Sequence, residues 1–136
     1  MKISMVPHED DALIHDVIGQ FLSKQIIDDG RYGVEDIVSY IKSGTCNLWV
    51  VSDGEDRCAA TVTMFVDYPR RVDLIGMFLL GSRMDEWGDQ LVDVLSEFAA
   101  ANNCKYIHIG GRRGWVRRLE RYGFEHKYVN VQKAVQ

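Results

Sequence analysis

The segment 79–88, LLGSRMDEWG, holds the residue types of a phosphate-binding loop. Its glycine, serine and arginine at 81–83 lie between an apolar run and the start of a long helical pattern, where backbone N–H groups and a guanidinium can bind an anion. Asp85 and Glu86 follow directly, and their charge would repel a phosphate. Two alternatives are therefore open: the loop binds an anionic ligand, or its acids are favourable first-turn residues of a helix that binds none.

The segment 112–121, RRGWVRRLER, has the most unusual composition in the chain. Arg113, Arg117 and Arg121 recur at intervals of four and therefore share one face of an expected helix. From 112 to 127 there are six Lys or Arg and two Glu, so this segment carries +4 in a chain whose net charge is −4. The overall acidity argues against general nucleic-acid binding. The arginines form either a solvated face paired with acids or a surface for an acidic protein or nucleic acid.

The residue patterns of disulfide frameworks, metal sites, nucleotide-binding loops and nucleophile elbows are missing from the sequence. The three cysteines are odd in number and widely spaced, and the four histidines include no pair four residues apart, so we expect neither a disulfide framework nor a metal site. No G-x-G-x-x-G follows an expected strand, and the segment 81–83 lacks the lysine of a P-loop. Ser82 lies at a strand-to-helix turn but lacks the second glycine of a nucleophile elbow.

The length of 136 residues suits one compact domain with a single core, and we expect 1–136 to form it. Hydrophobic residues make up 46% of the chain and charged residues 26%, as is typical of a soluble globular protein. Acids at positions 9–11 interrupt any signal-peptide pattern. No apolar run reaches the roughly 20 residues of a membrane span. We therefore expect a cytoplasmic protein with no membrane partner.

Hydrophobic periodicity predicts two helices before residue 44 and three strands after it. Asp53 and Gly54 predict a two-residue hairpin turn. The nearly unbroken apolar run after Asp73 predicts a central strand that is covered on both faces. The expected strands are 2–6, 47–52, 58–66, 72–80 and 105–109, with a final strand or hairpin at 124–135. The expected helices are 7–29, 34–43, 84–103 and 114–122.

The order of these elements, β-α-α-β-β-β-α-β-α-β, resembles the GCN5-related N-acetyltransferase (GNAT) superfamily across the chain. The segment LVDVLSEFAAANNCKYIHI is similar to the helix and fifth strand that follow the family's cofactor loop, and LERYGF is similar to the lYeklGF ending of its fourth helix. LLGSRMDEW combined with GRRGWVRRLERYGF also resembles short GNAT-like proteins of bacteriophages. The resemblance implies an α+β fold with helices on both faces of a mixed, mostly antiparallel sheet, splayed between its fourth and fifth strands to admit acetyl-coenzyme A.

The family's cofactor loop has the form Q/R-x-x-G-x-G/A, and it donates backbone N–H groups to the pyrophosphate. In this chain Arg83 takes the first place and Gly88 the last, whereas Glu86 stands at the middle glycine. A side chain there obstructs the close approach of the phosphates, and its charge repels them. The resemblance also offers a third interpretation of the arginines, as contacts to phosphate. It implies that acetyl-coenzyme A is held by Met77, Phe78, Leu79, Gly81, Ser82, Arg83, Gly88 and Arg112.

For its chemistry the family uses a carboxylate on the fourth strand as base and a tyrosine near the fourth helix as acid. Asp73 is the only acid between 72 and 80, so the resemblance implies that it deprotonates the amine; the alternative is a solvated residue at the start of the strand. Leu119 stands at the family's tyrosine position, and Tyr122 lies about one turn further on. Tyr122 is therefore either the acid that protonates the thiolate or a packed core residue.

Two functions are compatible with these residues. The first is an N-acyltransferase that moves an acetyl group from acetyl-coenzyme A to an amine of a small molecule or protein. The acids of the early helices, at 9–11, 28–29 and 35–36, would attract a cationic acceptor. The second is a phage accessory or virion-associated protein of the same fold, which acts by contact with protein or nucleic acid and does not bind coenzyme A. Glu86 and Leu119 favour the second, since both stand at positions of cofactor binding or chemistry. A homodimer or a phage structural partner is compatible with either, in the host cytoplasm or the virion.

Overall fold

The computed structural model describes residues 1–110 and 113–136. Within them, five strands form one sheet in the order β1-β2-β3-β4-β5. Neighbouring strands are antiparallel except β4 and β5, which are parallel. The strands are β1 (Lys2–Met5), β2 (Cys46–Asp53), β3 (Asp56–Tyr68), β4 (Arg71–Gly81) and β5 (Cys104–Ile109), and the helices are α1 (Asp11–Phe21), α2 (Ser23–Asp29), α3 (Val34–Lys42), α4 (Met84–Ala101) and α5 (Arg113–Glu120).

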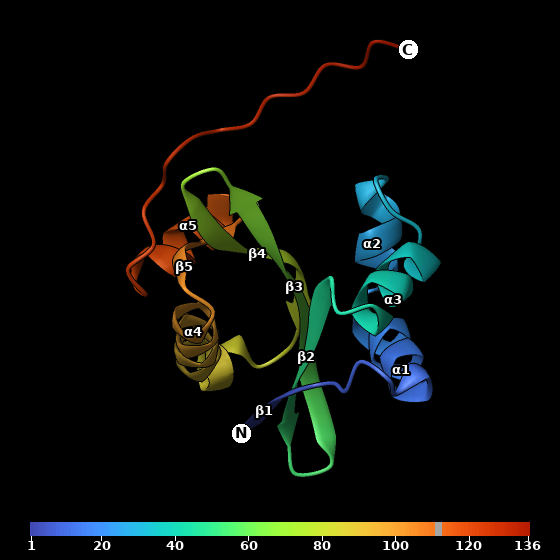
Figure 1. The fold of residues 1–136 in the computed structure, drawn as a ribbon. Helices are drawn as coiled ribbons and strands as arrows, with labels where there is room; N and C mark the ends of the chain where they lie inside the picture. Colours follow the sequence, from blue (N-terminus) through green and yellow to red (C-terminus); the bar gives the residue numbers. More distant parts are fainter. Residues whose placement is uncertain (111–112) are drawn as a thin grey trace.

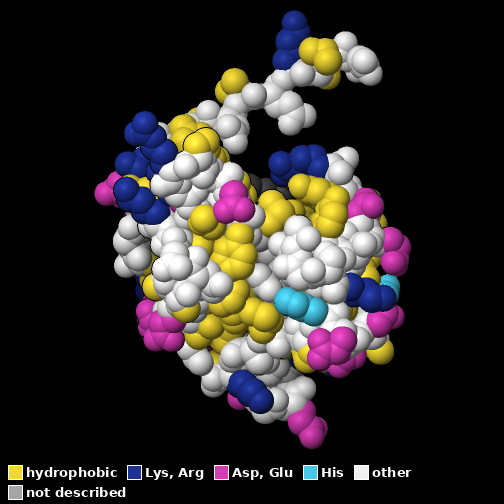
Figure 2. All heavy atoms as spheres, in the orientation of Figure 1, with side chains coloured by type: hydrophobic (Ala, Val, Ile, Leu, Met, Phe, Trp, Pro, Cys, Tyr) yellow, Lys and Arg dark blue, Asp and Glu magenta, His cyan; other side chains and the backbone are white. Residues whose placement is uncertain are grey.

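Helices cover both faces of the sheet, as the family resemblance implies (Figure 1). The first three helices lie on one face, and α4 lies on the other. In the same orientation, hydrophobic side chains gather in the middle of the visible face and charged side chains lie mainly around it (Figure 2). The expected α+β class, with a mixed and mostly antiparallel sheet, is confirmed.

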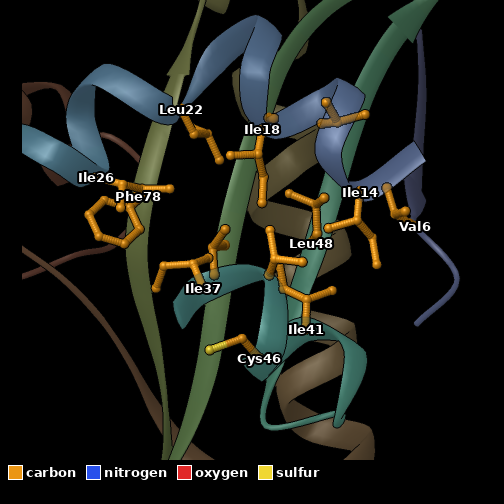
Figure 3. Close-up of a cluster of buried hydrophobic side chains, with 14 of the residues drawn as sticks. Val6, Ile14, Ile18, Leu22, Ile26, Ile37, Ile41, Cys46, Leu48 and Phe78 are labelled. Atoms are coloured by element: carbon orange, nitrogen blue, oxygen red, sulfur yellow. The ribbon is translucent and has the colours of Figure 1, made fainter. Parts of the chain in front are cut away.

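The core on the side of the first three helices consists mainly of branched aliphatic side chains (Figure 3). Ile14 and Ile18 of α1 and Ile37 of α3 are fully buried against Leu48 of β2. Burying one such side chain stabilises the fold by about 1.5–3 kcal/mol. Phe78 of β4 belongs to the same cluster, so one of the residues expected to bind the cofactor is held by the core.

The core on the opposite side is built on α4, whose apolar residues recur at spacings of four. Trp87, Leu91 and Leu95 pack against Trp49 of β2 and Leu74 of β4. This spacing places them on one face of the helix, so a single stripe of α4 covers the sheet. The packing fixes where α4 begins relative to the end of β4.

The first helical segment differs from the expected helix 7–29. The chain forms a turn before Asp10, whose side chain caps α1 by accepting a hydrogen bond from the Leu13 N–H at 3.2 Å. The helix is then interrupted at Leu22, which separates α1 from α2. Leu22 and Ile26 are both fully buried in one core, so the interruption keeps both helices packed on the same face of the sheet.

The expected strand 124–135 is wrong. Residues 124–136 form no regular element, and their trace leaves the body of the molecule (Figure 1). Val129, Val131 and Val135 alternate as in a strand, yet they remain 71%, 95% and 87% exposed. No described strand pairs with this segment, so its alternating pattern lacks the cross-strand contacts that stabilise a strand.

Candidate functional site

The parallel strands β4 and β5 separate along their length. Their pairing ends at Gly76 and Ile109, and within the described residues the segment 77–81 of β4 is paired only with β3. The strand also bulges at Met77, because the register with β3 passes over that residue. We call the region beyond the last pair, with residues 77–81 on one side, the fork. Its free strand edge can bind an extended ligand through backbone hydrogen bonds.

Gly76 brings the two strands close at the base of the fork. A Cβ atom at this position would lie 3.3 Å from the Ile109 side chain, which is a tight contact. Beyond it, Met77 and Phe78 pack against the core of α1–α3, and Leu79 packs against the core of α4. These three of the residues expected to hold the cofactor therefore use their side chains for packing. The Phe78 carbonyl accepts from the Thr61 hydroxyl at 2.7 Å, so only the backbone groups that face away from β3 are left for a ligand.

Asp73 lies three residues before this base, and its side chain is 0% exposed. Its Oδ2 atom lies 2.7 Å from Nε2 of His108 and 3.0 Å from a terminal nitrogen of Arg71. Its Oδ1 atom is buried and has no hydrogen-bond partner among the described residues. The alternative of a solvated residue at the start of the strand is therefore wrong, while the role of base is a matter for experiment.

His108 and Arg71 complete a polar cluster that the sequence analysis missed. His108 belongs to β5, where it is in register with Ile75, and Arg71 opens β4. The Arg71 guanidinium also stacks on the ring of Tyr106 at 4.5 Å. The parallel register of β4 with β5 brings His108 and Tyr106 to Asp73 and Arg71. A single histidine in a short strand gives no local sequence signal of this pairing.

At the other end of β4 lies the loop of residues 81–88, here called the α4 loop. A Cβ atom at Gly81 would overlap Ala59 of β3, so this glycine is required for strand pairing. The Ser82 N–H donates to the Cys58 carbonyl at 2.9 Å, and the Ser82 carbonyl accepts from the buried Trp87 indole at 2.6 Å. Packing thus explains Gly81 and Ser82 without any ligand.

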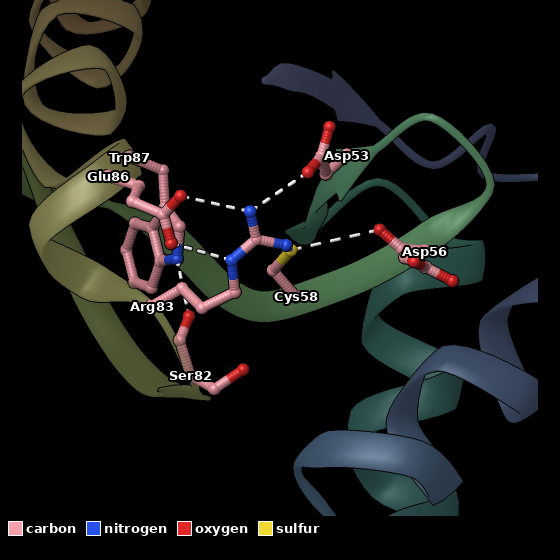
Figure 4. A network of polar contacts seen from close by, with 7 residues as sticks. All are labelled: Asp53, Asp56, Cys58, Ser82, Arg83, Glu86 and Trp87. Atoms are coloured by element: carbon pink, nitrogen blue, oxygen red, sulfur yellow. Dashed lines mark hydrogen bonds and ion pairs between the residues drawn. The ribbon is translucent and has the colours of Figure 1, made fainter.

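Arg83 is held by two carboxylates (Figure 4). It donates to both carboxylate oxygens of Glu86 at 2.6 and 2.9 Å, and to Asp53 of the β2–β3 turn at 2.9 Å. These bonds raise the pKa of the Arg83 guanidinium, and the bond from Arg83 lowers the pKa of Glu86. The positive charge of Arg83, which was expected to bind a phosphate, is therefore balanced by carboxylates of the protein itself.

Tyr122 covers the last glycine of the α4 loop. A Cβ atom at Gly88 would lie 2.7 Å from the Tyr122 hydroxyl, so this glycine makes room for the ring. Burial, followed by the charge of Asp89, raises the pKa of Tyr122. Arg118 of α5 also pairs with Asp85 in the first turn of α4. These contacts hold the end of α5 on the start of α4.

The expected catalytic pair is not brought together. Asp73 lies near the start of β4, whereas Tyr122 packs on the second turn of the helix that follows this strand. Eight residues separate Asp73 from Gly81, which is about 26 Å of extended strand. The expected contact Arg112 lies outside the described residues.

Two further properties bear on the kind of site. Among the residues that the structure describes, no group of three His, Cys, Asp or Glu could hold a metal ion. In the same residues no helix combines the length and the apolar composition needed to cross a membrane.

Comparisons with known proteins identify the fold. No family model and no curated protein matches the chain. A probable acetyltransferase of known structure is similar at a TM-score of 0.76, with 12% identity over 100% of this chain and 99% of its own. A predicted acetyltransferase from Clostridium acetobutylicum, solved with acetyl-CoA, gives 0.70 at 14% identity, covering 96% of this chain and 95% of its own. Glucosamine-6-phosphate N-acetyltransferase from Arabidopsis thaliana gives 0.71 at 14%, covering 99% and 98%. The chain therefore has the fold of GNAT acetyltransferases.

Proposed function

We propose that this chain is an N-acyltransferase, which binds an acyl thioester along the fork and transfers the acetyl group of acetyl-coenzyme A to an amine. The observation that carries the proposal is the free edge of β4, which begins at the bulge at Met77 where pairing with β5 has ended. Beyond Gly76 the edge of β4 is no longer paired with β5. The bulge at this edge presents backbone donors and acceptors to a ligand.

The thioester arm of the donor fits the residues present. Its pantetheine part is a chain with two amide groups, and the backbone groups of residues 77–79 that face away from β3 offer amide partners for it; the Phe78 carbonyl is already bonded to the Thr61 hydroxyl. Because the side chains of these residues pack into the two cores, they do not cover that edge. When bound, acetyl-coenzyme A supplies an activated acyl group, which a well-placed amine can attack directly.

The pyrophosphate of the donor does not fit the α4 loop as it stands. The N–H groups at a helix N-terminus suit an anion. In α4, however, the Glu86 N–H already donates to the Arg83 carbonyl at 2.9 Å. Arg83 is also engaged by Glu86 and Asp53, and the Tyr122 hydroxyl occupies the space above Gly88. The donor would therefore be bound mainly through its thioester arm, and phosphate binding requires Arg83 to exchange a carboxylate for a phosphate.

The acceptor is proposed to be a cationic amine of a small molecule or a protein. Between residues 9 and 36 there are eight acidic residues and two basic ones. These residues lie on the helices that cover one face of the sheet, the face toward which Phe78 points. An acidic surface raises the local concentration of a cationic substrate.

A second candidate rests on the α4 loop alone. Its carboxylates and arginines are satisfied by each other, and Tyr122 covers the glycine that would admit a phosphate. On this interpretation the chain is a phage accessory or virion-associated protein of acetyltransferase fold that acts by contact with a protein. It would not bind coenzyme A.

Calorimetric titration separates the two. We expect acetyl-coenzyme A and S-acetylpantetheine, which lacks the nucleotide and its phosphates, to bind with similar affinity. Glu86→Ala should tighten only the coenzyme, by about fivefold, because it removes a repulsion of about 1 kcal/mol and releases Arg83. The matched control is Glu97→Ala at an exposed position of the same helix. No heat and no thermal shift with either thioester at millimolar concentration would contradict the proposed enzyme and support the second candidate.

A further inference from the structure

His108 lies at the base of the fork. It is in register with Ile75, one pair before the last pair of β4 and β5. Met77, where the free edge begins, is two residues beyond Ile75, or about 7 Å along the strand. His108 is therefore the imidazole beside the point at which a thioester bound along β4 would end.

The partners of Asp73 fix which nitrogen of His108 carries the proton. Its Oδ2 atom forms an ion pair with Arg71 at 3.0 Å and lies 2.7 Å from Nε2 of His108. A carboxylate that is paired with a guanidinium offers only acceptor oxygens, so Nε2 is the donor. In the neutral imidazole the lone pair is then on Nδ1, and none of the described residues bonds that atom.

Burial distinguishes the two residues. Asp73 is 0% exposed and cannot touch a substrate, whereas the His108 side chain is 27% exposed. Asp73 also keeps one oxygen buried without a described partner, an arrangement that costs free energy. A buried carboxylate that orients a partly exposed imidazole is suited to positioning a base.

We infer that His108 is the proton acceptor of the acyl transfer and that Asp73 is its positioning residue, an inference that rests on the proposed function. Nδ1 of His108 takes one proton from the ammonium of the acceptor, and the neutral nitrogen forms the C–N bond to the thioester carbonyl. As the C–S bond breaks, a second proton of that nitrogen passes to the leaving sulfur. His108 then releases its proton to solvent, so the products are an amide, a thiol and one proton.

A kinetic experiment tests the role of His108. Acetyl-coenzyme A is offered with a polyamine, a lysine-containing peptide and an amino sugar, and thiol release is followed with a thiol-reactive dye. We expect His108→Ala to lower kcat at least 100-fold with little change in KM, and millimolar imidazole to restore part of the rate. Asp73→Asn should give a smaller loss, which imidazole does not restore. The control His126→Ala, at an exposed position near the C-terminus, should match the unmodified protein.

The outcomes separate this inference from the proposal on which it rests. If the unmodified protein transfers acetyl groups and His108→Ala is equally active, or is inactive and not restored by imidazole although it is folded, the inference is wrong and the proposed function stands. If neither thioester binds, the proposed function fails first. Ring nitrogen shifts of His108 by NMR give a readout without turnover: we expect the Nε2–H tautomer, and a mixture in Asp73→Asn. An Nδ1–H tautomer would contradict the inference.

Discussion

The fork and the α4 loop that follows it differ in how far the protein satisfies its own polar groups. At the α4 loop, Arg83 is bonded to two carboxylates, and Ser82 is bonded through both its N–H and its carbonyl. At the fork, the edge of β4 that faces away from β3 lacks a described partner beyond Gly76. Backbone groups that are left unpaired cost free energy, so they mark the fork, rather than the loop, as the place for a ligand.

The same difference separates two kinds of glycine in one strand. Gly81 is required because a side chain would overlap the neighbouring strand. At Gly76 a Cβ atom would be tight only against the flexible side chain of Ile109, at 3.3 Å, and it would make an ordinary contact with the His108 carbonyl at 3.7 Å. A glycine in a phosphate-loop pattern is thus explained by sheet packing. The residue type alone does not distinguish the two causes.

The largest expected effect comes from removing the anchor of the α4 loop. Trp87 is 1% exposed and donates to the Ser82 carbonyl. Trp87→Ala should lower the free energy of unfolding by about 3–5 kcal/mol, as measured by urea denaturation. Trp87→Phe retains most of the packing and should lose clearly less. Equal losses for both variants would show that the indole hydrogen bond, rather than packing, holds the loop.

The next effect compares the two glycines directly. Gly81→Ala should lower the free energy of unfolding by about 1–3 kcal/mol, because its methyl group overlaps β3. Gly76→Ala should cost less than about 1 kcal/mol, since the Ile109 side chain can move aside. Denaturation curves for the pair test this order, and the reverse order would contradict the assignment of the tight contact to the loop end.

A smaller effect on stability is expected at Tyr122, whose phenol packs over Gly88 of the α4 loop. Burial and the charge of Asp89 raise its pKa, so the folded state holds this proton more tightly than the unfolded state does. Its contribution is present below the ordinary tyrosine pKa of about 10 and is lost as pH rises through the raised value. Absorbance titration at alkaline pH should show one late phenol that is absent in Tyr122→Phe. Identical titrations would place Tyr122 in solvent.

The smallest effect concerns the exposed pair of Arg83 and Glu86. The bond from Arg83 lowers the pKa of Glu86, so its stabilisation is present above the ordinary glutamate pKa and is lost as pH falls through the lowered value. Glu86→Gln should therefore have a slightly lower melting temperature at pH 7, with the difference shrinking under acid and in high salt. Glu97→Gln is the control, and a difference that grows under acid would contradict the pairing.

The sequence predicted most elements because their signals are local: the apolar stripe of α4 and the turn at Asp53 and Gly54 needed no long-range information. The α+β class was implied by the resemblance of the element order to a known family, and it is confirmed. The strand expected at 124–135 failed because alternation says nothing of whether a partner strand is present.

The site was less predictable because it depends on pairing between distant segments. Asp73 was selected as the lone acid of a strand, yet its burial and its bond to His108, 35 residues away, depend on the parallel register. Glu86 was expected to obstruct a phosphate because its side chain stands where the family's loop has a glycine. The structure adds that it binds Arg83, which no spacing rule in the sequence specifies.

An amide-resolved NMR titration with acetyl-coenzyme A tests the central claim most directly. The account predicts that the largest shifts fall on the fork, at residues 77–79 of β4 and at His108 and Ile109 of β5, with smaller shifts at 83–86 of the α4 loop. Shifts confined to the α4 loop, or an unchanged spectrum at millimolar ligand, would contradict it.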